Sequence, residues 1–153
     1  MTDDRTRQLG KWSLSEGASL LETALIAPVL LLLVAGTVDL GRAYTAAIEV
    51  QEAAHSGALY GTQNPTDRTG MQKTAEGQAS NFSELTATAS YGCECSDGSS
   101  AVESCTTIPT CTYNYVDYVS VTATVEFSPI FPYPGLPSSF KLNSTSRLRA
   151  GGD

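Results

Sequence analysis

The sequence of 153 residues has few basic side chains. Lysine and arginine together number 9, against 16 aspartates and glutamates, and the sequence pI is near 4.6. A chain with this balance lacks the positive field that nucleic acids and other acidic polymers require. We therefore exclude nucleic-acid binding.

Catalytic motifs are lacking as well. The single histidine, His55, has no serine or cysteine at motif spacing, and the sequence has no glycine-rich phosphate loop with a lysine. His55 lies in a stretch with helical periodicity, where a solvated helix residue is the simplest interpretation. We expect a protein that is not an enzyme and that needs no cofactor.

What the sequence does contain is one long apolar run. Within residues 18–40 the only charged side chains are Glu22 and Asp39. As a helix this segment would be about 35 Å long at ~1.5 Å per residue, enough to cross hydrocarbon of ~30 Å. The sequence therefore predicts one membrane-spanning helix over residues 18–40. Because Pro28 has no amide hydrogen, we expect a local kink of the helix there.

The basic residues give this helix an orientation. Arg5, Arg7 and Lys11 precede the apolar run, whereas Arg42 is the only basic residue between the run and Arg68. By the positive-inside tendency the N-terminus is cytoplasmic and the C-terminal part lies outside. We expect a single-pass protein of the inner, or cytoplasmic, membrane with an extracytoplasmic domain.

Helical periodicity continues beyond the apolar run. It predicts that the helix leaves the membrane without a break, continues over residues 41–61 as an amphipathic helix, and ends near Gly61 and Asn64-Pro65. The expected packing face consists of small or apolar residues spaced three or four apart: Leu40, Ala43, Ala47, Val50, Ala54 and Ala58.

Residues 62–153 are expected to form one small α+β domain. A shorter helix is predicted from Asp67 to about Phe82, with Thr66 as its cap. Residues 85–91 alternate between apolar and polar side chains and suit a strand.

The alternation of apolar and polar side chains is clearest over residues 118–127, where one face of the strand should be buried and the other exposed to solvent. A proline-rich loop over 128–137 precedes a last strand over 140–149. The predicted fold is therefore α+β: a long N-terminal helix, half transmembrane and half amphipathic, packed on a small antiparallel sheet.

Four cysteines, Cys93, Cys95, Cys105 and Cys111, lie in the part assigned to the outside. An even number of clustered cysteines in an oxidising compartment indicates disulfides. A zinc site is the weaker interpretation, because the first pair is C-x-C rather than C-x-x-C and His55 is far upstream. We expect a disulfide-braced domain and no metal site.

Three connectivities are possible for four cysteines. A turn near Gly98 favours the nested one, in which Cys95 pairs with Cys105 and Cys93 with Cys111. The other two remain open. A nearby aromatic cluster, with the members Tyr113, Tyr115 and Tyr118, is interpreted as sheet packing rather than as a contact surface.

Glu22 is the costly residue of the apolar run. A carboxylate inside the membrane costs on the order of 3 kcal/mol on insertion scales, so it needs a partner or a place near the headgroups. In the first turn of the helix an acid would also complement the helix N-terminus. The second interpretation is that Glu22 pairs with a cationic group of a neighbouring subunit.

The surroundings of Glu22 resemble the class III signal of type IV prepilins. A short polar leader, residues 1–17, ends in Gly17, and a cut there would place Glu22 fifth in the mature chain. More specifically, three segments resemble the TadE-like family of pseudopilins: GASLLETALIAP (17–28), VDLGRAY (38–44) and AAHSGALYG (53–61). The similarity extends from residue 17 to about residue 61.

This resemblance implies a minor pilin of the tight-adherence (Tad, or Flp) pilus. A prepilin peptidase would cut between Gly17 and Ala18, and Glu22 would then meet the new amine of Ala18 in an adjacent subunit. Two opposite charges in a low-dielectric bundle would fix the axial register of the subunits. The implied partners are the membrane, other pilins or pseudopilins, the Tad assembly platform and the peptidase.

By this resemblance the product takes part in pilus assembly or initiation, supports adhesion or biofilm formation, and can enter an extracellular pilus. The alternative is an uncleaved single-pass anchor whose extracytoplasmic domain binds a ligand or partner. The behaviour of Glu22 separates the two, because only a pilin needs that carboxylate for filament assembly.

Overall fold

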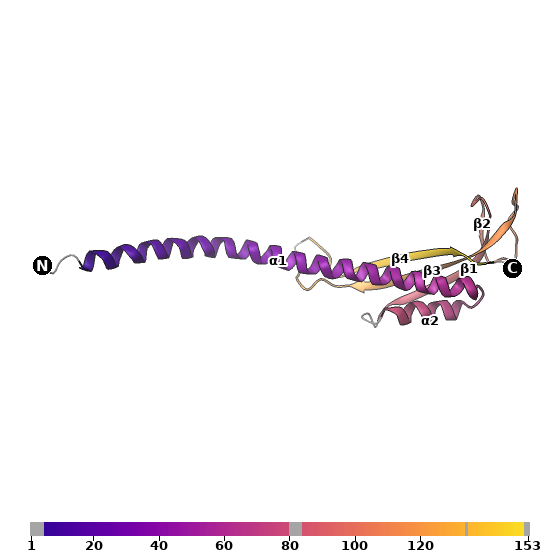
Figure 1. Ribbon diagram of the computed structural model, residues 1–153, viewed down its shortest axis with the longest axis horizontal. Coiled ribbons are helices and arrows are strands. Elements are labelled where there is room, and N and C mark those ends of the chain that lie inside the picture. Colours follow the sequence, from indigo (N-terminus) through magenta and orange to yellow (C-terminus); the bar gives the residue numbers. More distant parts are fainter. Residues whose placement is uncertain (1–4, 80–83, 134, 152–153) are drawn as a thin grey trace. The chain divides into compact units, whose positions relative to one another are not determined.

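The computed structural model describes residues 5–79, 84–133 and 135–151, with side chains described from residue 19 onward. Two compact units divide the chain, residues 1–41 and residues 42–153. The elements are α1 (Arg5–Gln63), α2 (Arg68–Gln78), β1 (Thr86–Cys95), β2 (Ala101–Glu103), β3 (Tyr115–Phe127) and β4 (Phe140–Arg149), as drawn in Figure 1.

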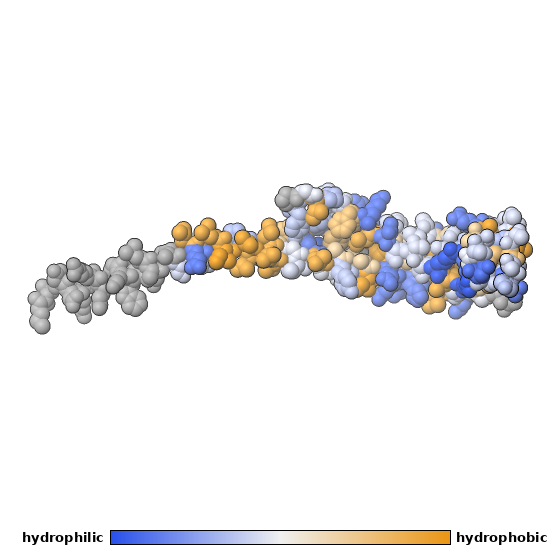
Figure 2. Space-filling model, turned by 90° about the horizontal axis from the view of Figure 1, so that it is seen from above, coloured by the Kyte–Doolittle hydropathy of each residue, from blue (hydrophilic) through white to orange (hydrophobic). Residues whose placement is uncertain are grey.

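The first unit contains the apolar part of α1. Its large side chains are exposed, with Leu21 at 67%, Leu25 at 71% and Leu31 at 70%, and Figure 2 shows a predominantly hydrophobic surface over its described part. By length and composition this helix can cross a membrane. Helical geometry continues through Pro28, and the kink expected at that residue stays a prediction.

The hydroxyls of Thr23 and Thr37, the two threonines of this apolar segment, donate within the helix itself. Thr23 Oγ1 donates to the carbonyl oxygen of Ser19 at 3.0 Å, and Thr37 Oγ1 donates to that of Val34 at 2.8 Å. Such bonds to the preceding turn let threonine enter lipid without an unpaired donor. The threonines are therefore compatible with a membrane-spanning segment.

The second unit packs the C-terminal part of α1, together with α2, on one face of a four-stranded antiparallel sheet. The strand order is β2-β1-β3-β4. β4 matches the predicted strand over residues 140–149, and β1 runs beyond the predicted end at residue 91 to Cys95. The α+β fold predicted from the sequence is confirmed.

Alternation along β3 builds the core of the second unit. One face is buried and the polar residues between are partly or fully exposed, as the pattern over residues 118–127 predicts. The buried face consists of Val119, Val121, Ala123, Val125 and Phe127. Two clusters form on it, one around Val50 of α1 and one around Met71 of α2.

Side chains on the packed face of α1 are small. Gly57 lies so close to α2 and β3 that an added Cβ would come within 2.8 Å of the carbonyl oxygen of Met71 and 3.1 Å of Val121 Cγ1. At Gly61 it would come within 2.6 Å of Met71 Sδ. α1 continues past this glycine to Gln63 and ends directly before Asn64-Pro65, within the region predicted for its end.

The face of α1 that packs on α2 and the sheet also differs from the predicted one. Val50, Ala54 and Ala58 are buried as expected, but Leu40 is 71% exposed and Ala47 is exposed. α1 contacts both α2 and the sheet, so its buried stripe is wider than a three-four spacing suggests. The residues added to the stripe are Ala46, Ala53 and Gly57.

α2 begins one residue later than predicted, and its cap is Asp67 rather than Thr66. Asp67 Oδ1 accepts from the amide of Gly70 at 2.9 Å, and Asp67 Oδ2 accepts from Tyr60 Oη at 2.9 Å. The Gly70 amide and then the Tyr60 hydroxyl lower the pKa of Asp67, and the same bond to Asp67 raises the pKa of Tyr60. α2 ends at Gln78, four residues before the predicted end at about Phe82, and Phe82 itself lies outside the described residues.

Candidate functional site

Glu22 stands on an exposed, apolar surface of α1. Its neighbours Leu21, Leu25 and Ile26 are 67%, 71% and 49% exposed, and the carboxylate makes no hydrogen bond or ion pair with the part of the chain that the structure describes. An acid in such surroundings is costly in lipid without a counter-charge. The pairing predicted for Glu22 therefore stays a prediction, and a counter-charge for it would come from another molecule or from the membrane interface.

Gly17 and Ala18, the residues of the predicted cleavage, lie within the helical backbone of α1. Their side-chain environments are outside the described part of the structure. Cleavage between them therefore stays a prediction.

The cysteines form two disulfides, Cys93–Cys105 and Cys95–Cys111, with Cα–Cα distances of 5.2 and 5.4 Å. All four cysteines are used, as predicted, but the nested pairing is wrong, because the two bridges interleave. The reason lies in the hairpin of β1 and β2. Its register pairs Cys93 with Val102, so Cys95 lies beside the turn, away from Cys105.

Backbone geometry after β2 completes this pairing. The amide of Ser104 donates to the carbonyl oxygen of Tyr91 at 3.0 Å, and Ser104 has a φ of 82°. This left-handed turn redirects the chain, and Cys105 then bonds Cys93 rather than Cys95. Cys95 pairs with Cys111, which lies in the segment that leads into β3.

An acid lies against the first bridge. Asp117 Oδ1 is 3.2 Å from Cys93 Sγ and 3.8 Å from Cys105 Sγ, while Asp117 Oδ2 accepts from Tyr91 Oη at 2.7 Å. That bond to the carboxylate raises the pKa of Tyr91, and burial adds to the effect. These sulfurs and this oxygen lie within 4.8 Å of one another, but the thiolates that a metal needs are joined in the disulfide.

Sequence reasoning missed a charge cluster on the opposite face of the sheet. Glu94, 9% exposed, accepts from Arg147 Nη2 at 2.6 Å and from Arg149 Nε at 3.0 Å. Arg149 also donates to the carbonyl oxygen of Ser96, and the Arg147 guanidinium lies 3.7 Å from the ring centroid of Tyr118. This cluster joins β4 to β1 across β3. Arginines two apart on an alternating strand were the available signal.

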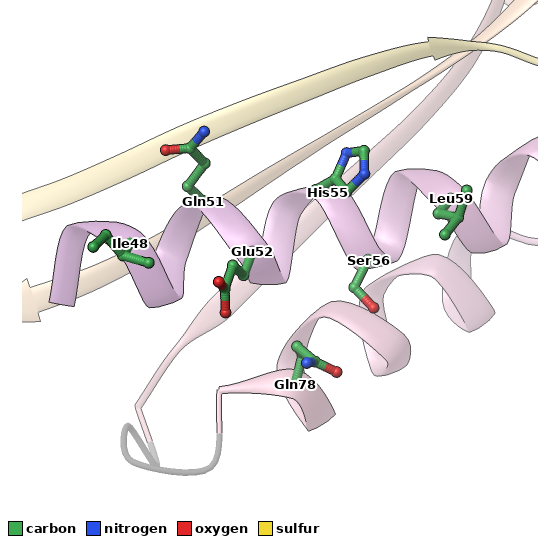
Figure 3. A pocket seen from close by; sticks show the side chains of 7 residues that line it. All are labelled: Ile48, Gln51, Glu52, His55, Ser56, Leu59 and Gln78. Atoms are coloured by element: carbon green, nitrogen blue, oxygen red, sulfur yellow. The ribbon is translucent and has the colours of Figure 1, made fainter. Parts of the chain in front are cut away.

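His55 lies on an open groove rather than in a catalytic pocket. Figure 3 shows its lining along α1, with Gln51 and His55 on the side of β4, Glu52 and Ser56 on the side of α2, and Gln78 of α2. His55 Nδ1 is 3.5 Å from Ser146 Oγ, and His55 makes no other hydrogen bond with the described residues. Both side chains are solvent-accessible, so this contact has the character of a weak surface interaction.

Of the predicted aromatic cluster, only Tyr118 packs in the sheet. It is 6% exposed, whereas Tyr113 is 76% and Tyr115 47% exposed. Sheet packing therefore explains only one of the three tyrosines. The other two lie at the disulfide-braced end of the second unit, Tyr113 in the loop before β3 and Tyr115 at the start of β3. Ile108, in the loop between β2 and β3, is exposed as well.

Residues 17–59 match the family model of the TadE-like proteins. This match confirms the family resemblance, covers Glu22 and the packed face of α1, and ends before α2 and the sheet. Neither a curated protein nor a solved structure matches the chain.

Proposed function

We propose that this chain, whose residues 17–59 match the TadE-like family, is a minor pilin. It takes part in the assembly or initiation of a Tad pilus and so supports adhesion or biofilm formation. The observation that carries the proposal is Glu22, a lone carboxylate on an exposed apolar helix surface, five residues after Gly17. Catalysis is no part of this role.

Glu22 acts as a register contact between subunits. After a prepilin peptidase cuts behind Gly17, Ala18 bears a new positive amine at the start of the helix. In a bundle of apolar helices this amine and the Glu22 carboxylate of a neighbour neutralise each other, which offsets the desolvation of both. A helix displaced by one turn would leave both charges unpaired, so the pair selects one axial position.

The second unit is the part that projects from the membrane. The N-terminus is cytoplasmic and the disulfide-braced domain is extracytoplasmic, in keeping with the basic leader and the oxidised cysteines. Before assembly the chain is a single-pass protein of the inner membrane. Other pilins or pseudopilins and the Tad assembly platform are its partners.

Glu22→Gln tests this function in cells that assemble the pilus. We expect the variant to insert and to be processed, but to be lost from sheared filaments, because the amide cannot neutralise the Ala18 amine. Glu52→Gln is the matched control, since Glu52 is an exposed acid on the same helix outside the apolar run. Mass spectrometry of the mature N-terminus completes the test, and recovery of intact residues 1–17 would exclude a cleaved pilin.

A second candidate is an uncleaved membrane anchor with a binding domain. The exposure of Tyr113 and Tyr115 on the disulfide-braced end favours it, because exposed aromatic side chains on a rigid support are typical of binding surfaces. In that case Glu22→Gln leaves any filament unchanged. Replacement of both tyrosines by serine would then abolish partner binding.

A further inference from the structure

The loop between β3 and β4 has an unusual composition for a surface segment. Residues 128–139 contain no charged side chain and four prolines. Its apolar residues are exposed, with Ile130 at 57%, Phe131 at 45% and Leu136 at 63%. Uncharged, exposed apolar clusters of this kind mark contacts with another surface.

The backbone of the loop presents these side chains in a defined way. The amide of Leu136 donates to the carbonyl oxygen of Tyr133 at 3.1 Å, and Gly135 has a φ of 89°. This bond closes a tight turn, and the left-handed conformation suits glycine. Leu136 is therefore held at an exposed turn rather than folded back on the sheet.

The direction of β3 fixes which end of the domain carries the loop. Successive residues of β3 contact residues of α1 that come progressively earlier in the sequence. Val119 lies at Gly61, Val121 lies at Gly57, and Val125 clusters with Val50. β3 is thus antiparallel to α1. The chain that follows β3 therefore runs towards the residues of α1 that come directly after the apolar run.

The residues at the two ends of the loop, Phe127 and Phe140, pack on each other, and Phe127 lies beside Arg42 of α1. The ring centroids of Phe127 and Phe140 are 5.2 Å apart, and the Arg42 guanidinium carbon lies 5.4 Å from the Phe127 centroid. Arg42 comes two residues after the apolar run of residues 18–40. In Figure 1 the β3–β4 connection lies at the opposite end of the sheet from β2. The loop therefore emerges beside Arg42, the first residue of the second unit, and in the sequence the apolar run ends two residues before Arg42.

We propose that residues 128–139 insert into the outer interface of the membrane that α1 spans. The occupant of this apolar surface is lipid, because the loop lies at the level of Arg42, has no charge, and combines aromatic with aliphatic side chains as interfacial segments do. The inference rests on the membrane span of the proposed function. It gives the domain a second membrane contact that fixes its height on the bilayer.

Tryptophan reporters test the contact in the full chain. Trp12→Phe removes the only native tryptophan, and Phe131→Trp then reports from the loop in nanodiscs of phosphatidylcholine and phosphatidylglycerol. We expect emission at shorter wavelength and several-fold stronger quenching by lipids brominated near the headgroup than for Ile108→Trp. Ile108 is the matched control, 55% exposed in the loop beyond β2. Leu136→Trp is a second reporter if Phe131→Trp disturbs the fold.

Val29→Trp separates this inference from the membrane span itself. Quenching of Val29→Trp without quenching of either loop reporter would refute the lipid contact and leave the span intact. Because Val29 lies near the middle of residues 18–40, its reporter is measured with lipids brominated near the ends of their acyl chains. Absence of quenching at Val29 in those lipids would refute the span and the loop contact together. A blue shift at Phe131→Trp that bromine does not quench and that disappears with one chain per disc would identify a second copy as the occupant, which also refutes the proposal.

Discussion

The close approach of α1 to α2 makes Gly57→Ala the sharpest test of the packing. An added Cβ at Gly57 comes within 2.8 Å of the Met71 carbonyl oxygen, 3.0 Å of Ala75 Cβ and 3.1 Å of Val121 Cγ1. The first of these is a backbone atom and cannot rotate away. We expect Gly57→Ala to destabilise the second unit.

Two opposing effects set the size of this loss. Alanine is favoured over glycine within a helix by about 1 kcal/mol, whereas forcing one extra methyl into a close-packed site costs about 1–3 kcal/mol. Because three neighbours from α2 and β3 must all shift, we place the packing cost in the upper part of this range, at about 2–3 kcal/mol, and expect a net loss of about 1–2 kcal/mol. Gly77→Ala is the matched control, since no atom lies within 4 Å of its added Cβ. That variant should be unchanged or slightly stabilised, by at most about 1 kcal/mol.

Urea unfolding of the full chain in detergent, followed by the near-ultraviolet circular dichroism of its tyrosines, measures both variants with the disulfides intact. The difference between Gly57→Ala and Gly77→Ala cancels the helix preference of alanine and leaves the packing cost. If both variants gain stability equally, α1 and α2 are further apart than the structure has them. The close packing of the two helices would then be refuted.

Three further variants test the charges and bridges of the second unit. Glu94→Gln should lower stability by about 1–2 kcal/mol, since it loses charged bonds to partly exposed arginines, and a double-mutant cycle with Arg147→Lys should show coupling. Replacing Cys93 and Cys105 by serine opens a loop of sequence separation 12 and should cost about 3 kcal/mol by thermal unfolding. For Asp67 the pKa is lowered in the folded state, so its stabilisation is present above the ordinary value of 3.8 and is lost as the pH falls through the folded value. The stability difference between wild type and Asp67→Ala, from urea titrations at several pH values, should therefore shrink in acid.

Strand positions were predictable because one face of the sheet is buried. The alternation over residues 118–127 and the strand over 140–149 both correspond to strands of the structure. A shift of one residue would move valines such as Val119 and Val121 to the wet face, so sequence alone specifies the register of such a strand. A helix from Asp67 to about Phe82 was predicted from its spacing of apolar residues, and α2 covers Arg68–Gln78 of that range.

Disulfide pairing was not predictable from the same signals. The turn signal at Gly98 correctly indicated a hairpin, but the bridges depend on the path of the backbone after β2. Ser104 adopts a φ of 82°, which serine rarely does. The local sequence gives no reason to expect that turn, so the partner of Cys105 remained open until the backbone was known.

The Glu94 cluster escaped prediction for a different reason. Its arginines, Arg147 and Arg149, lie on β4, and Glu94 lies on β1, more than fifty residues earlier. Strand order brings them together, since β3 separates the two strands by one position. Contacts of this kind follow from topology, which the alternation of a single strand does not reveal.

Side-chain size, rather than hydrophobicity, marks where α1 changes its surroundings. Over residues 20–34 the apolar side chains are large and exposed, as suits contact with lipid or with neighbouring helices. From Ala46 to Gly61 the buried positions are alanine, glycine and one valine, which allow α2 and the sheet to approach closely. The charged residues Asp39 and Arg42 lie between these two patterns. One helix can therefore suit contact with lipid along its apolar run and close packing in the folded domain further on, because its apolar side chains change from large to small between the two parts.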